Sequence, residues 1–165
     1  SKAKNKMDEP SYQSFSKEEI PAFIGKGYSA QVVAGTYEGI TGPVITDFPI
    51  TSLVIDFTEE STFKATLPND WNGFVYSIYD PILFLGFGLL DAKAAGVLKP
   101  GDFSFSSSSG NKVLIMMGKP TEEKVTQHGP FVMNTQTEVL EAMRDYQMGK
   151  MGFLVEEFDS FLPEN

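Results

Sequence analysis

Two neighbouring segments, Thr51-Ser52-Leu53-Val54-Ile55-Asp56-Phe57 and Ser61-Thr62-Phe63-Lys64-Ala65-Thr66-Leu67, decide the fold class of this chain. Apolar side chains occupy every second position of each segment: Leu53, Ile55 and Phe57 in the first, and Phe63, Ala65 and Leu67 in the second. Successive side chains of a strand point to opposite faces of its sheet, so a period of two indicates a strand with one buried face. Both segments therefore predict β-strands.

Further short strands are predicted on either side, at residues 30–34, 71–79, 81–87, 94–98, 103–106 and 113–117. In 71–79 the large apolar residues Phe74, Tyr76 and Ile78 share one face. Lys99-Pro100-Gly101-Asp102 separates two of the strands, and Gly101 would supply the positive φ of a type II turn. About eight to ten strands with turn signals every 8–12 residues are typical of antiparallel sandwiches and barrels. We expect a mainly β fold, an antiparallel β-barrel or jelly roll.

The sequence changes character after Pro120. Thr135 and Glu138 fit a capping box, and Val139, Leu140, Met143 and Tyr146 then recur at helical spacing. Gly149 is suited to the C-terminal cap, so a helix is expected over about residues 136–148. Phe153 to Leu162 is apolar for a chain end, and we expect it to dock on the barrel or on another domain.

Three parts follow from these patterns. Residues 1–27 read as a linker and lead-in segment, in which Ser16 to Glu19 resembles a helix start of one turn at most. Residues 28–131 form the expected barrel, and within it 106–111 read as a loose polar loop. Residues 132–165 carry the helix and the apolar tail.

Composition removes several classes of chemistry. The 165 residues include one histidine and no cysteine, which excludes a disulfide, a thiolate nucleophile and any multi-histidine metal site on this chain. The net charge of −9 repels phosphate, so direct nucleic-acid binding is not expected. The most apolar stretch, 81–90, is about half the roughly 20 residues that a membrane span needs. We expect no membrane partner, and the absence of cysteine fits a reducing compartment such as the cytoplasm.

Candidate functional residues are few, and each has a structural alternative. His128 could bond a ligand or a partner domain, but a half-exposed turn histidine is the commoner case. Phe74 and Tyr76 could line a cavity, although a place in the core is the more usual role of strand aromatics. The adjacent glutamates at 59–60, 122–123 and 156–157 point apart and read as solvated charge.

One segment is more specific than composition. Residues 125–135, V-T-Q-H-G-P-F-V-M-N-T, resemble the segment near the end of pirin-family proteins. We call residues 125–135 the signature segment; within it Gln127, His128, Gly129, Pro130, Phe131, Val132, Met133, Asn134 and Thr135 are taken as the family signature and a possible domain seam. The opening K-M-D-E-P-S-Y-Q at 6–13 and Gly118-Lys119-Pro120 resemble the same family, so the likeness covers nearly the whole chain.

The resemblance implies a bicupin, in which one chain forms two antiparallel β-barrels. The first barrel of the family carries iron on three histidines and a glutamate, and the second is usually metal-free. This chain is similar to the second half only. Thr62-Phe63-Lys64 stands where a metal-binding cupin would place H-x-H. The resemblance implies no catalytic residue, metal ligand or cofactor here, with Fe expected on the missing N-terminal cupin.

Two functions remain open at this stage. In the first, the chain is a metal-free structural and interaction module whose partner is the N-terminal cupin half, and transcription-factor proteins are further partners of the family. In the second, the chain is a small-molecule binder or a flavonol dioxygenase-type enzyme that uses its barrel cavity, with Phe74, Tyr76 and His128 as contacts. Family members are described both as nuclear transcription cofactors and as quercetin 2,3-dioxygenases. The first is favoured.

Overall fold

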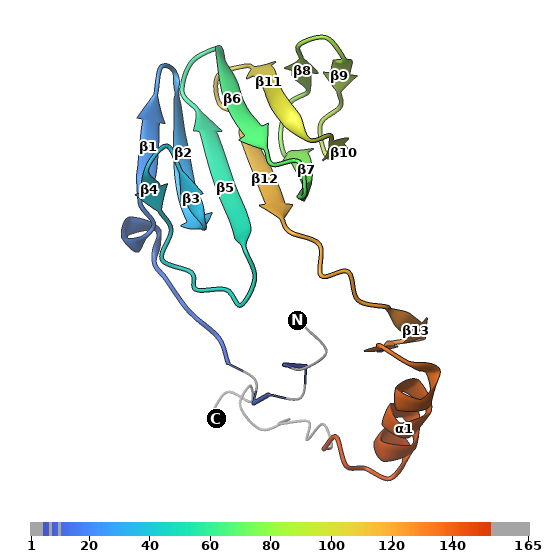
Figure 1. The fold of residues 1–165 in the computed structure, drawn as a ribbon. Coiled ribbons are helices and arrows are strands. Elements are labelled where there is room, and N and C mark those ends of the chain that lie inside the picture. The colour runs from blue at the N-terminus through green and yellow to red at the C-terminus, as the bar shows by residue number, and fades with distance from the viewer. Residues whose placement is uncertain (1–4, 7, 10, 153–165) are drawn as a thin grey trace, which may run out of the picture. The chain divides into compact units, whose positions relative to one another are not determined.

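The computed structural model describes residues 5–6, 8–9 and 11–152, and the chain divides into two compact units at Thr121/Glu122. The first unit contains two antiparallel sheets that face each other (Figure 1). The larger sheet has the strand order β1-β2-β5-β12-β7-β10. Its strands are β1 (Ala22–Gly25), β2 (Tyr28–Ala34), β5 (Ile50–Phe57), β12 (Lys112–Gly118), β7 (Asn72–Ser77) and β10 (Ala95–Leu98).

The smaller sheet has the order β6-β11-β8-β9. It consists of β6 (Ser61–Leu67), β11 (Gly101–Ser107), β8 (Ile82–Phe84) and β9 (Gly88–Leu90). A hairpin of β3 (Thr36–Tyr37) and β4 (Ile40–Thr41) follows β2, and one 3-10 turn, η1 (Lys17–Glu19), precedes β1. The short helical turn predicted at 16–19 and the antiparallel barrel are both confirmed.

The hydrophobic core lies between the two sheets, where the period-two pattern places it. Leu53 and Ile55 on β5 are fully buried, and Phe63 and Leu67 on β6 are fully buried opposite them. Gly101, predicted to have a positive φ between β10 and β11, has a φ of 110° as the first residue of β11.

The prediction for β7 is wrong about which face is buried. Val75 and Ser77 are fully buried, whereas Phe74 is 41% exposed and Tyr76 lies beside it on the outer face of the sheet. Register explains the reversal, because β7 pairs with β12 so that Val75 faces Ile115, an inward residue. Residues paired across strands share a face, so the inward face of β12 fixes that of β7.

A buried amide replaces the loose loop predicted at 106–111. Asn111 is 1% exposed; its Oδ1 accepts bonds from the backbone N–H groups of Tyr79 and Asp80, both at 3.1 Å. Its Nδ2 donates to Ser77 Oγ at 3.0 Å and to Ser107 Oγ at 2.9 Å. Asn111 therefore joins the turn after β7 to the hairpin between β11 and β12.

The second unit consists of a hairpin and a helix. β13 (Thr126–His128) pairs with β14 (Phe131–Met133), and α1 (Gln136–Gln147) packs on this hairpin. The predicted capping box is present, since Glu138 N–H donates to Thr135 Oγ1 at 3.3 Å and Thr135 N–H donates to Glu138 Oε2 at 2.9 Å. Gly149 follows with a φ of 72°, as its role in the cap requires.

Two features of the second unit differ from the sequence prediction. The expected barrel end at residue 131 is too late, because β13 pairs with β14 and not with a barrel strand. On α1 the buried residues are Val139 and Ala142, whereas Leu140 and Tyr146, both expected in the buried stripe, are exposed. The apolar tail from Phe153 to Leu162 lies outside the described residues. Within the described part, no helix is long and apolar enough to cross a membrane.

Candidate functional site

The barrel interior, where a cupin would hold a metal, is filled by aromatic rings. Tyr37 stacks on Phe63 with ring centroids 5.4 Å apart, and Phe63 is 5.4 Å from Phe105. Phe84 extends the row at 5.4 Å from Phe105. Phe63 and Phe105 are fully buried. These ring positions suit packed aromatic pairs.

Tyr37 is the polar end of this aromatic row. Its hydroxyl donates to the backbone carbonyl of Lys64 at 3.0 Å, and the residue is 8% exposed. Burial raises the pKa of Tyr37 well above its ordinary value, because the phenolate would lose its hydration. Tyr37 therefore stays protonated at neutral pH, as a hydrogen-bond donor and not as a base.

The segment Thr62-Phe63-Lys64 is arranged for packing and not for metal binding. Phe63 points into the core, Thr62 Oγ1 is 2.7 Å from Ser106 Oγ, and the Lys64 side chain is exposed. Over the described residues, no group of three or more His, Cys, Asp or Glu side chains lies close enough to hold a metal ion. The side chains here do not fit the iron site of a metal-binding cupin.

An open hollow of about 550 Å³ lies where β5 begins and β6 and β12 end. Tyr37, Thr51, Trp71 and Met117 line it, and Glu38 stands at its side. Thr36, Thr51 and Thr66 bring hydroxyl groups to the lining, and Glu38 brings one carboxylate. This hollow is large enough to admit a small molecule.

Phe74 and Tyr76, predicted as possible cavity residues, do not line this hollow or the aromatic interior. Both lie on the outer face of β7, beside the 45% exposed Met116 of β12. His128, the third contact of the enzymatic hypothesis, belongs to the second unit. The enzymatic hypothesis therefore loses two of its three proposed contacts.

The signature segment forms the β13–β14 hairpin and the start of α1. His128 and Phe131 are paired across the hairpin, and the side chains of Gln127, His128 and Pro130 are exposed. Phe131 turns toward the helix, with its ring 5.9 Å from that of Tyr146 in an edge-to-face arrangement. Asn134 Nδ2 donates to the carbonyl of Lys124 at 2.9 Å. The polar tip of the hairpin is thus exposed, while Phe131 and Asn134 form contacts with nearby residues of the same unit.

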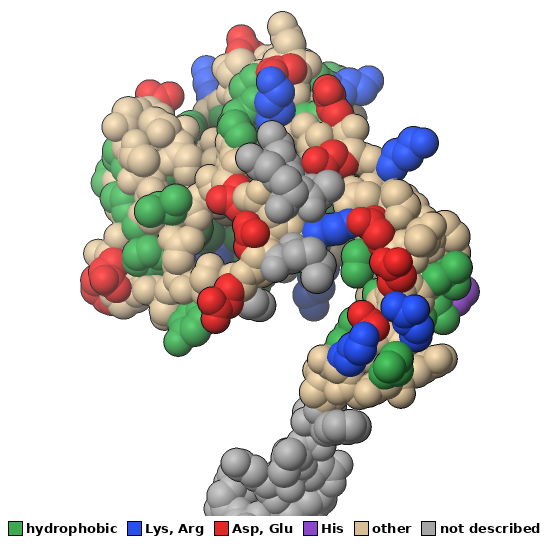
Figure 2. Space-filling model, turned by 60° about the horizontal axis from the view of Figure 1, so that its bottom comes forward, with side chains coloured by type: hydrophobic (Ala, Val, Ile, Leu, Met, Phe, Trp, Pro, Cys, Tyr) green, Lys and Arg blue, Asp and Glu red, His purple; other side chains and the backbone are tan. Residues whose placement is uncertain are grey.

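Two residues that organise the barrel were missed in the sequence. Asn111 ends a run of serines and a glycine that is typical of a solvated loop. The turn at Tyr79-Asp80-Pro81, which Asn111 contacts in the fold, was the one sequence signal of a special arrangement. Tyr37 lies in a two-residue strand too short to show a period. On the face that Figure 2 shows, Asp and Glu side chains are spread without one dominant cluster.

Comparison with known proteins links this geometry to one family. Residues 52–152 match the model of the pirin C-terminal cupin domain. The chain is 38% identical over 157 residues to Pirin-1 of Arabidopsis thaliana, covering 90% of this chain and 54% of that protein. It is 33% identical over 161 residues to Pirin of Homo sapiens, covering 92% and 54%. The chain thus spans about half the length of these relatives.

A solved structure shares the architecture. Quercetin 2,3-dioxygenase from Acinetobacter baumannii superposes with a TM-score of 0.83 at 25% identity, over 93% of this chain and 55% of that one. GK1651 from Geobacillus kaustophilus gives a TM-score of 0.66 at 23% identity, over 73% and 51%, which bears on the fold alone.

Proposed function

This chain belongs to the pirin family as a C-terminal cupin domain, and we propose that it acts as the metal-free structural and interaction half of a two-barrel protein. In this proposal the iron and any dioxygenase chemistry belong to an N-terminal cupin. The chain supplies that cupin with a rigid neighbour and a binding surface.

The observation that carries the proposal is the packed barrel interior. A cupin that binds iron needs several nitrogen and oxygen donors converging inside the barrel. Here the interior is occupied by Tyr37, Phe63 and Phe105, and the sole ionisable group among them is a tyrosine that stays protonated. Placing imidazoles there would require removal of core side chains, so the interior serves stability.

The exposed tip of the signature segment supports an interaction role. Gln127, His128 and Pro130 are exposed, and Val132 on the same hairpin is 55% exposed. We propose this tip as part of the seam with the N-terminal cupin. Transcription-factor proteins are proposed as partners of the whole two-barrel protein, in the cytoplasm or nucleus. This part of the proposal rests on the resemblance to the family and not on a site on this chain.

A chimaera tests the seam. This chain would replace the matched half of Arabidopsis Pirin-1, and thermal unfolding would be followed by calorimetry. A docked seam predicts one cooperative transition, which the double variant His128→Ala with Val132→Ala splits into two. The matched control is Ile24→Ala, which removes a 74% exposed apolar side chain from β1 of the barrel. Two independent transitions in the unmodified chimaera would contradict the seam.

Turnover tests the division of chemistry. The isolated chain, supplied with Fe²⁺ and quercetin in air, is expected to consume no flavonol above the rate of an iron-only blank. Turnover that rises in proportion to the protein concentration would place catalysis on this chain and overturn the proposal.

A further inference from the structure

The β8–β9 hairpin exposes an unusual number of apolar side chains. Phe87 at its tip is 81% exposed and Leu89 is 65% exposed. β9 is also the edge of the smaller sheet, where exposed strands usually carry charges that prevent aggregation. Clusters of exposed apolar side chains commonly mark binding sites. The hairpin therefore needs an explanation that the barrel core does not supply.

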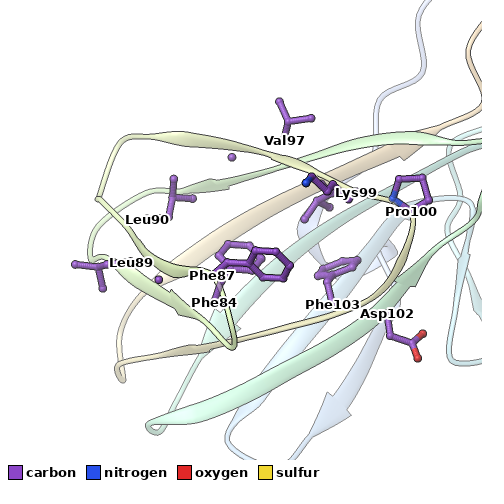
Figure 3. Close-up of a pocket in the computed structure, with 12 residues that line it drawn as sticks. Phe84, Phe87, Leu89, Leu90, Val97, Lys99, Pro100, Asp102 and Phe103 are labelled. Atoms are coloured by element: carbon purple, nitrogen blue, oxygen red, sulfur yellow. The ribbon is translucent and has the colours of Figure 1, made fainter.

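A cleft of about 280 Å³ lies between this hairpin and the segment that joins β10 to β11. Phe84, Leu90 and Phe103 are partly buried, pack against the barrel core and form its floor. Phe87 and Pro100 stand at its rim. Figure 3 shows the rings of Phe84, Phe87 and Phe103 gathered beneath the segment that carries Lys99 and Pro100. The cleft offers a flat ring several aromatic neighbours.

The two charged residues at the cleft, Lys99 and Asp102, differ in whether they are available to a ligand. Lys99 is exposed, lines the cleft and has no ion pair with any described residue. Asp102 accepts a hydrogen bond from Thr66 Oγ1 at 2.7 Å, and Figure 3 shows it pointing away from the aromatic rings. Pro100 restricts Lys99 to an extended backbone, which limits where the ammonium group can reach. The rim thus offers one available cation beside an aromatic floor.

From this arrangement we infer that the cleft is a binding site for a small aromatic carboxylate, with its ring over Phe103 between Phe87 and Pro100 and its carboxylate paired with Lys99. The inference is independent of the proposed function, because it uses neither the signature segment nor the barrel interior. No residue of the cleft is a nucleophile or a base, so the site binds its ligand without chemistry.

Volume sets the size of the ligand. A cavity of about 150 Å³ accommodates benzene, and drug-sized ligands take pockets of about 300–1,000 Å³. The cleft of about 280 Å³ thus fits one or two fused rings. A three-ring flavonol would extend beyond it, which separates this site from the dioxygenase substrate of the structural relative.

The test uses 2-naphthoate and the full 165-residue chain, followed by amide chemical shifts in nuclear magnetic resonance. Saturable one-to-one binding is expected with a dissociation constant of about 1 mM or tighter, as the usual affinity per ligand atom implies. The shift changes should concentrate at the cleft, on Phe84, Gly88, Leu90, Gly96, Lys99 and Phe103.

Two variants separate the ring contact from the charge contact. Phe87→Ala should weaken 2-naphthoate about three- to tenfold, as lost aromatic contacts do. Lys99→Gln should weaken it by about threefold or more at low salt, and the difference should shrink with added salt. For the neutral analogue 2-naphthalenemethanol, Lys99→Gln should leave the affinity unchanged.

Phe74→Ala is the matched control, because it removes an exposed aromatic side chain outside the cleft and should leave 2-naphthoate binding unchanged. Phe87 is so exposed that its loss should not unfold the barrel, and the unchanged spectrum of the free variant checks this. The inference is overturned by absence of saturable binding, by shift changes centred elsewhere, or by equal affinities in the parent chain and both cleft variants.

Discussion

The barrel interior and the hairpin–helix unit differ in where their informative residues lie. In the barrel, the aromatic and aliphatic side chains of Leu53, Ile55 and Phe57 on β5 and of Phe63 and Leu67 on β6 are buried. In the hairpin–helix unit, the described residues include two buried apolar side chains, Val139 and Ala142, and the family signature is largely exposed. The signature segment therefore lies outside the part of the chain where large side chains are buried.

The comparison teaches that the two units should respond differently to substitution. Burial of large side chains makes the barrel sensitive to volume and to unpaired polar groups. The second unit depends on local contacts, chiefly the capping box and the hairpin pairs. Substitutions in each unit, compared with exposed controls, test this difference.

The largest effect is expected in the aromatic row. Phe63→Ala should lower the free energy of unfolding by about 3–5 kcal/mol, because it deletes a fully buried ring and leaves a cavity. Chemical denaturation followed by tryptophan fluorescence measures this through Trp71. Phe74→Ala, on the exposed side of β7, is the control and should cost much less. Equal losses for the two variants would break the assignment of the faces.

The next effect concerns the buried amide. Asn111→Ala should lower the free energy of unfolding by about 2–3 kcal/mol, because the backbone N–H groups of Tyr79 and Asp80 lose their acceptor. The exposed Asn72→Ala serves as the control and should stay within about 0.5 kcal/mol. A loss below about 0.5 kcal/mol for Asn111→Ala would show that water satisfies these groups.

A smaller and local effect is expected at the helix cap. Thr135→Ala should destabilise α1 by about 1 kcal/mol, because the Glu138 N–H loses the side-chain oxygen that it bonds. Hydrogen exchange should accelerate in the first turn of α1 and remain unchanged in β5 and β12. Faster exchange throughout the barrel would contradict the independence of the two units. Thr137→Ala, at the second position of the helix, is the control.

The smallest effect is expected from a surface ion pair. The hydrogen bond from Lys150 Nζ to Asp145 Oδ1, at 2.8 Å, holds the pKa of Asp145 below its ordinary value of 3.8. Its contribution is therefore present at neutral pH and is lost as the pH falls below 3.8 through the folded-state pKa. Asp145→Asn should lower helix stability at pH 7 by less than Thr135→Ala does. Its effect should vanish at strongly acidic pH, as thermal unfolding at both pH values would show.

The sequence predicted the fold wherever the period of two was uninterrupted. Leu53, Ile55 and Phe57 are all buried as expected, because a strand with one core face must alternate. The same reasoning failed on β7, where the larger side chains, Phe74 and Tyr76, lie outside and Val75 lies inside. The register of β7 is set by β12, whose pairing is a long-range property that local hydrophobicity does not reveal.

The candidate site was less accessible to sequence reasoning. The motif at 125–135 identified the family, but it carried no information on what its residues contact. The Thr135–Glu138 cap was predictable because its partners are three residues apart. The role of Asn111 was not, because Asp80, one of its partners, lies 31 residues away. The apolar stretch at 81–90 was visible in the sequence, whereas the position of Lys99 beside it required the fold.

Titration of the isolated chain with Fe²⁺ under anaerobic conditions, followed by calorimetry, tests the central claim most directly. EDTA titrated in the same buffer verifies that the metal is available. The packed interior predicts no binding site of micromolar affinity on the 165-residue chain. A tight one-to-one iron site would contradict the account, since it would require donors that converge where Phe63 and Phe105 now lie.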